Sequence, residues 1–150
     1  MRHFPRLFFA WLGLLLGSGL TAWAAGPYDT VRIDTVKTSI YVGNVTLSTT
    51  LLKRANGAYA TDYKAKVFPY FFYNETGHLS IDFSDDQLAQ LARGETVQFK
   101  GHAENSDHEP RRVEGRAVPT DGTQGKLKVR VFVSPKIELI FNTIYHFDKP

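Results

Sequence analysis

The pattern that most constrains this chain is the alternation of apolar and polar residues over several segments beyond Gly26. A period of two places successive side chains on opposite faces of an extended chain, which is typical of strands with one buried and one solvated face. Turn signals separate these segments, and no linker is long enough to divide the chain. We therefore predict one all-β domain, an antiparallel barrel or sandwich of about seven or eight strands.

The first predicted hairpin runs from Ser39 to Leu52 and returns from Ala58 to Phe68, around a turn that contains Asn56-Gly57. Asn-Gly pairs supply the positive φ that short hairpin turns require. Pairing Arg54 with Ala58 gathers the apolar residues of both strands on one face, whereas a one-residue slip would mix the faces. In that register Val45 faces Val67, Leu47 faces Ala65 and Thr49 faces Tyr63.

One short helix is predicted from Asp85 to Arg93, because the signals at both of its ends are complete. Ser84 can cap the N-terminus, and Gln87 can close a capping box. Gly94 supplies the left-handed residue that commonly ends a helix. The apolar side of this helix, which we expect to dock on the end of the sheet, carries Leu88 and Leu91.

The second half of the chain predicts a four-strand meander, because its turns agree on one apolar face. The turn around residues 106–110 pairs Gly101 with Gly115 on that face. The two later turns pair Val113 with Val131 and Val129 with Phe141. The opposite face is charged and is interpreted as solvated, with His102, Glu114 and Arg130 in one cross-strand row.

The first 24 residues have the three regions of a secretory signal peptide. A basic start containing Arg2 and Arg6 precedes the apolar run Leu7–Leu20, and Ala22-Trp23-Ala24 supplies a cleavage pattern. The apolar run is shorter than the roughly 20 residues that span a bilayer. We predict cleavage after Ala24, which leaves residues 25–150 as a single exported domain, periplasmic or extracellular.

Charge and composition narrow the function classes. The net charge of +3 includes Arg2 and Arg6 of the leader, so the mature domain is nearly neutral, and no basic run suits a nucleic acid. Cysteine is absent, which removes disulfides and thiolate chemistry. No nucleophile elbow or phosphate-binding glycine loop occurs. His102 and Glu104 could share a strand face as metal ligands, but no third ligand has a compelling spacing. We predict a non-enzymatic domain with no catalytic residues, metal or cofactor.

Residues 67–73 form the densest apolar run of the mature chain and include Tyr70, Phe71, Phe72 and Tyr73. Consecutive aromatic residues in an extended segment must point to both faces, so the outer set needs a cover. One interpretation places the run in the core, with the predicted helix over it. The other makes it an aromatic-lined pocket or a surface for a partner.

Gly101 and Gly115 are a second point of interest, because the predicted register sets two residues without side chains opposite one another. Glycine inside strands often marks tight curvature or the close approach of another group. Curvature there could close the sheet into a barrel. The same vacant space could instead admit an apolar ligand.

These observations predict an exported β-domain that binds a small apolar molecule or a protein partner, with no nucleic acid and no stable membrane insertion. The candidate binding residues are Tyr70, Phe71, Phe72, Tyr73, Gly101 and Gly115. One alternative is a small outer-membrane β-barrel, because residues 137–147 resemble the aromatic-ended final strand of that class. A metal-dependent hydrolase is a less favoured alternative.

Overall fold

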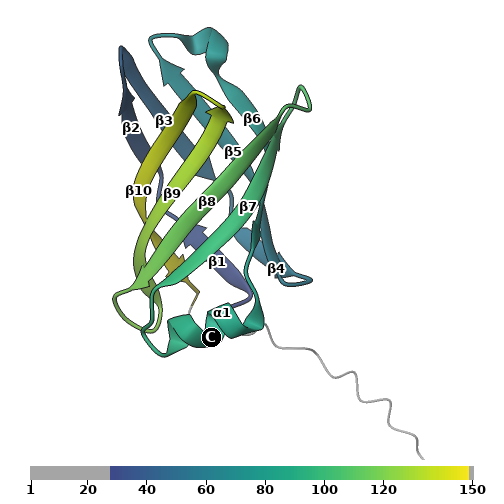
Figure 1. Cartoon of the computed structure of the whole chain (residues 1–150), viewed down its shortest axis with the longest axis vertical. Helices are drawn as coiled ribbons and strands as arrows, with labels where there is room; N and C mark the ends of the chain where they lie inside the picture. The colour runs from purple at the N-terminus through teal and green to yellow at the C-terminus, as the bar shows by residue number, and fades with distance from the viewer. Residues whose placement is uncertain (1–27, 149–150) are drawn as a thin grey trace, which may run out of the picture.

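The computed structural model describes residues 28–148, so the predicted leader lies outside the described part of the chain. Within it, strands dominate and one α-helix interrupts them (Figure 1). The elements are β1 (Thr30–Ile33), β2 (Val36–Ile40), β3 (Gly43–Thr49), β4 (Leu52–Ala55), β5 (Ala58–Phe68), the 3-10 turn η1 (Phe71–Tyr73), β6 (Glu75–Asp82), α1 (Asp85–Ala92), β7 (Val97–Asn105), β8 (Pro110–Pro119), β9 (Gln124–Ser134) and β10 (Ile137–Phe147).

The strands close into an antiparallel barrel. The ring runs through β1, β4, β5, β6, β7, β8, β9 and β10, and β10 pairs with β1 to complete it. Strands β2 and β3 extend the sheet beside the second half of β5. The predicted all-β class is confirmed, and the barrel is the alternative that the structure adopts.

The register of the first hairpin is confirmed over β3 and β5, where Val45 pairs with Val67 and Leu47 with Ala65. The single strand expected from Ser39 to Leu52 is wrong, because a turn at residues 41–42 separates β2 from β3. A second break at residues 50–51 separates β3 from β4, and an extra residue there shifts the pairing by one. Arg54 consequently pairs with Tyr59 and not with Ala58.

The predicted helix is confirmed, with both halves of its capping box. The Gln87 backbone N–H donates to Ser84 Oγ at 3.1 Å, and the Ser84 N–H donates to Gln87 Oε1 at 2.7 Å. Gly94 has a φ of 83° and ends the helix, with Arg93 as its C-cap. Leu88 and Leu91 are buried, so α1 closes one end of the barrel (Figure 1).

The meander β7–β10 is confirmed, but one of its registers is wrong by two residues. Phe99 pairs with Gly115 and Gly101 pairs with Val113, so the two glycines are not opposite one another. The turn between β7 and β8 spans Asn105 to Glu109, and the Asn105 N–H donates to the Glu109 carbonyl at 3.1 Å. The predicted charged row changes accordingly: Lys100, and not His102, lies beside Glu114 and Arg130.

The core is one cluster of buried side chains that extends along the barrel interior from the end that α1 closes. Phe141, Leu52, Val97 and Val113 are its most completely buried large side chains. A cavity of about 40 Å³ remains among Ile33, Tyr59, Phe99, Tyr145 and other apolar residues. Ligand pockets typically measure roughly 300–1,000 Å³, so this interior is a packed core.

Candidate functional site

The two candidate glycines lie on the barrel interior, where neighbouring atoms occupy the space beside them. A Cβ added at Gly115 would lie 2.6 Å from Cε2 of Phe99, and one at Gly101 would lie 3.1 Å from the Cα of Ile81. The Phe99 ring therefore fills the space that a side chain on Gly115 would take. Gly115 lines an outer hollow together with charged residues, and neither glycine lies with the aromatic segment that was predicted to share the site.

The aromatic candidates lie at the opposite end of the barrel from α1 (Figure 1). Phe71, Phe72 and Tyr73 are 75%, 67% and 66% exposed, and Tyr70 is also exposed. The predicted cover by the helix is thus wrong, because η1 and α1 occupy different ends of the molecule. The consecutive aromatic residues lie in the connection between β5 and β6, outside the sheet. Their side chains therefore need no second layer to cover them.

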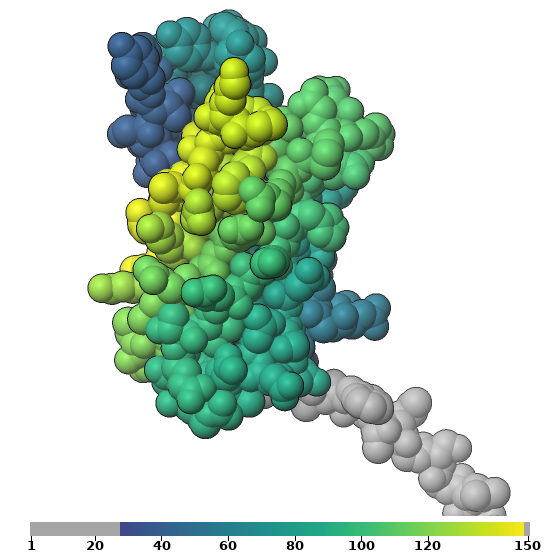
Figure 2. All heavy atoms as spheres, viewed as in Figure 1, coloured from purple at the N-terminus to yellow at the C-terminus, as the bar shows by residue number. Residues whose placement is uncertain are grey.

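The turn between β2 and β3 adds exposed residues beside this segment, and they were not predicted from the sequence. Tyr41 is fully exposed, and Val42 is half exposed. The two connections touch, since a Cβ at Gly43 would lie 2.8 Å from Cδ of Pro69 (Figure 2). We call the resulting surface the aromatic tip; it consists of Tyr41, Val42, Phe68, Tyr70, Phe71, Phe72 and Tyr73.

The tip has a defined conformation of its own. The Phe72 and Tyr73 ring centroids lie 4.7 Å apart, and the Phe71 and Phe72 centroids 6.0 Å apart. The Tyr73 N–H donates to the Tyr70 carbonyl at 2.9 Å, and the Asn74 N–H donates to the Phe71 carbonyl at 3.0 Å. Because aromatic pairs at such distances attract one another, the rings are held together before any partner arrives.

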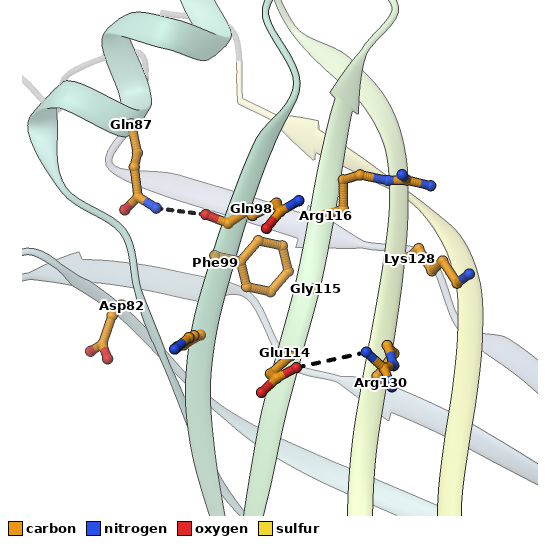
Figure 3. A pocket seen from close by; sticks show the side chains of 10 residues that line it. Asp82, Gln87, Gln98, Phe99, Glu114, Gly115, Arg116, Lys128 and Arg130 are labelled. Atoms are coloured by element: carbon orange, nitrogen blue, oxygen red, sulfur yellow. Dashed lines mark hydrogen bonds and ion pairs between the residues drawn. The ribbon is translucent and has the colours of Figure 1, made fainter.

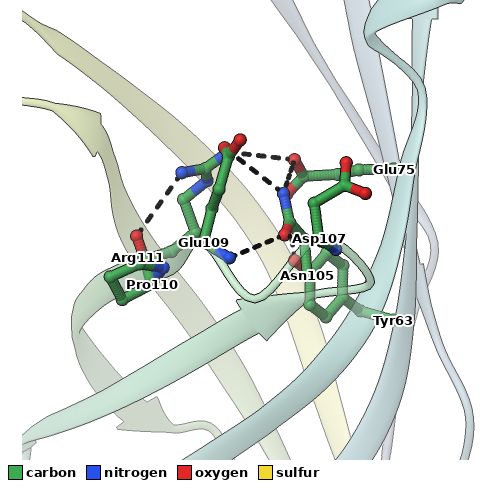
Figure 4. Close-up of polar contacts among 7 residues, drawn as sticks. All are labelled: Tyr63, Glu75, Asn105, Asp107, Glu109, Pro110 and Arg111. Carbon is green, nitrogen blue, oxygen red and sulfur yellow. Dashed lines mark hydrogen bonds and ion pairs between the residues drawn. The ribbon is translucent and has the colours of Figure 1, made fainter.

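A polar cluster anchors the tip to the barrel wall (Figure 4). Asn74 Oδ1 accepts a hydrogen bond from the Val67 N–H at 2.7 Å. The next residue, Glu75, accepts one from Tyr63 Oη at 2.9 Å and forms an ion pair with Arg111 at 3.1 Å. The Glu75 cluster, as we call it, comprises Tyr63, Glu75, Asn105, Glu109 and Arg111.

The electrostatics of the Glu75 cluster keep its hydrogen bonds in place. Burial, with the hydrogen bond to Glu75 adding to it, raises the pKa of Tyr63, so its phenol remains a donor. Burial opposes the charge on Arg111, but hydrogen bonds to Glu109 and Glu75 outweigh that effect and raise its pKa. The cluster therefore holds the start of β6 against the turn that begins β8.

A second candidate is a hollow of about 580 Å³ on the outer face beside α1 (Figure 3). One row across it alternates in charge, with Lys100 beside Glu114 and Glu114 beside Arg130. Glu114 and Arg130 form an ion pair at 3.8 Å. The next row sets Arg116 opposite Lys128. This surface matches the charged, solvated face expected from the sequence.

Of the two residues considered as metal ligands, Glu104 has another partner. Glu104 Oε1 contacts His108 Nδ1 at 2.6 Å. Among residues 28–148, no group of three or more histidine, aspartate or glutamate side chains could hold a metal ion. Over the same span, no helix has the length and apolar character needed to cross a bilayer.

Comparison with protein-family models, with curated proteins and with solved structures finds no match to this chain. The functional argument accordingly starts from the geometry of the barrel and its aromatic tip. Tyr41 and Val42 of the tip, and the Glu75–Arg111 pair that supports it, were not identified from sequence. The signal for the pair was present: Glu75 and Arg111 are charged residues at positions that the alternation assigns to the barrel interior.

Proposed function

We propose that the protein is an exported, non-enzymatic binding domain that docks on the apolar surface of a partner through its aromatic tip. One observation carries this proposal: the exposed Phe and Tyr residues gather at one end of the barrel and not over its walls. Contiguous exposed apolar patches in soluble proteins mark interaction surfaces. The export component follows from the predicted leader.

Aromatic residues suit this role energetically. Each buries about 150–250 Å² when covered, so a tip with six aromatic side chains can supply much of the area of a specific contact. The hydrogen-bonded turn at residues 70–74 and the Glu75 cluster hold the rings in place. Such preorganisation lowers the ordering entropy that binding would otherwise cost.

The sequence predicts binding of either a small apolar molecule or a protein partner, and the interior of the barrel gives less support to the small molecule. The packed interior leaves about 40 Å³ beside α1, and neighbouring atoms occupy the positions that side chains on the two candidate glycines would take. Docking on the outer surface of the tip requires neither a cavity nor a rearranged core. We therefore assign the binding role to Tyr70, Phe71, Phe72 and Tyr73.

The side chains on the outer wall of the barrel support the proposal that this wall faces water. Lys100, Arg116 and Lys128 point outward and are exposed, while Phe99, Val113 and Phe141 point inward and are buried. Spanning barrels have the reverse arrangement, with an apolar outer band and a polar interior.

Photo-cross-linking in the native host tests the proposal. A benzophenone amino acid replaces Phe71 in the tip, or Ile144 as a control on the outer face of β10, where the side chain is also exposed. Irradiation should give a defined adduct from position 71 and none from position 144. Equal labelling at both positions, or no adduct from position 71, would contradict a role for the tip. Mass spectrometry of the adduct identifies its chemical class.

A further inference from the structure

Resting on the proposed function, we infer that the aromatic tip docks on the interface of an anionic lipid bilayer. The positive charge beside the tip favours an anionic bilayer over an uncharged apolar partner. The two segments that build the tip, residues 36–49 and 63–73, contain Lys37, Lys64 and Lys66 and no aspartate or glutamate. All three lysines are exposed.

The register brings these cations to one side of the tip. Lys37 and Lys66 both pair with Thr46, so they lie in one cross-strand row with a neutral residue between them. Lys64 lies two residues before Lys66 on β5, on the same outer face but farther from the tip. Among the described residues, no ion pair joins any of the three to a carboxylate. Their charge is therefore free to act on an anionic surface.

The acidic residues near this surface have partners of their own. Asp62, two residues before Lys64 on β5, contacts His78, and Glu104 contacts His108. Glu75 and Glu109 share the guanidinium of Arg111, at 3.1 Å and 3.0 Å. Asp107 lies on the turn between β7 and β8, on another side of the barrel end. The face formed by β2, β3 and the second half of β5 thus combines aromatic rings with positive charge alone.

That combination matches the chemistry of a bilayer interface. Tyr and Trp rings favour the level of the lipid headgroups, and lysines beside them attract anionic phosphates. Entry into the interface also requires that backbone groups be satisfied. The N–H groups of Phe71, Tyr73 and Asn74 already donate to carbonyls within the connection, so these three groups need no hydrogen bonds to water when the turn approaches lipid.

The orientation follows from the shape of the molecule. The tip lies at one end of the long axis, opposite α1, and the charged walls extend along the barrel (Figure 1). Docking by the tip would leave those walls in water. This contact is reversible adsorption, and no strand would cross the bilayer.

Vesicle flotation with the protein purified from its host tests the inference. We expect it to float with vesicles of phosphatidylglycerol and phosphatidylcholine in equal parts, and far less with phosphatidylcholine alone. The Phe71→Ser/Phe72→Ser variant should bind at least about tenfold more weakly, because it loses its apolar contact area. Lys37→Gln/Lys66→Gln should weaken binding by roughly 25-fold at low salt, about fivefold for each lysine.

Two matched variants serve as controls. Lys126→Gln/Lys128→Gln removes as much charge from another wall, and Ile140→Ser/Ile144→Ser removes exposed apolar side chains from β10. Both should float like the unaltered protein. If an uncleaved leader caused the binding, the Phe71→Ser/Phe72→Ser variant would still float with the vesicles. Flotation of that variant would therefore overturn the inference.

The remaining outcomes separate this inference from the proposed function. Failure to float with either vesicle, together with a protein adduct from position 71, would overturn the lipid partner and retain the tip as a binding surface. Equal flotation with both vesicles, unaffected by the lysine changes, would overturn the requirement for anionic lipid. Failure of both flotation and cross-linking would overturn the inference and the proposed function together.

Discussion

At Gly115 the barrel wall has no room for a side chain. A Cβ there would lie 2.6 Å from Cε2 of Phe99 and 2.8 Å from the Lys128 carbonyl oxygen, and the backbone atom cannot rotate away. Gly115→Ala should therefore lower the free energy of unfolding by about 2 kcal/mol. Gly122→Ala is the matched control, because nothing lies within 4 Å of its Cβ position. Equal urea midpoints for the two variants would show that the ring yields without strain.

Two buried tyrosines make the barrel sensitive to alkali. Burial raises the pKa of Tyr59 and of Tyr145 from the ordinary 10.0 to about 12. Because the folded state favours the neutral phenol, this stabilisation is fully present below pH 10 and is lost as pH rises through 12. Urea denaturation between pH 10 and pH 12 should show a shallower loss of stability in Tyr59→Phe than in Tyr41→Phe, a change at the exposed tip. Identical slopes would contradict this assignment.

At the scale of elements, Arg111 joins the start of β6 to the start of β8. Its side chain is 11% exposed and contacts both Glu75 and Glu109. Arg111→Met should cost about 2 kcal/mol of unfolding free energy, because a partly buried carboxylate loses its charged donor. Arg112→Met removes a neighbouring arginine that is 64% exposed and paired with Glu114. An exposed pair contributes roughly 0–1 kcal/mol, so equal losses in the two variants would argue against the anchor.

Individual cross-strand residue pairs show which strand registers could be predicted from the sequence. Alternation specified the pairing of Val45 with Val67, because a one-residue slip would have exposed apolar side chains. A two-residue slip keeps every side chain on its face, so periodicity could not distinguish Gly101 from Phe99 as the partner of Gly115. The packing of the Phe99 ring over that glycine decides it. The contact between the two tip connections depends on the break between β2 and β3, which alternation does not reveal.

For the whole molecule, removal of the predicted leader has an optical consequence. Trp11 and Trp23 are the only tryptophans in the chain, and both precede the predicted cleavage after Ala24. The exported protein should therefore show tyrosine fluorescence with no tryptophan component. A variant with a blocked cleavage pattern, Ala22→Arg/Ala24→Arg, should retain tryptophan emission. Tryptophan emission from the purified exported protein would contradict cleavage at this position.

The most direct test asks whether the aromatic tip stands outside the folding core. Equilibrium urea unfolding compares the unaltered protein with Phe71→Ser/Phe72→Ser and with Phe141→Ala, whose phenylalanine is 2% exposed. The tip variant should keep its unfolding free energy within about 0.5 kcal/mol, because solvent already covers both rings. Phe141→Ala should lose about 3–5 kcal/mol. A comparable loss in the tip variant would assign these rings to the core and contradict their role as a binding surface.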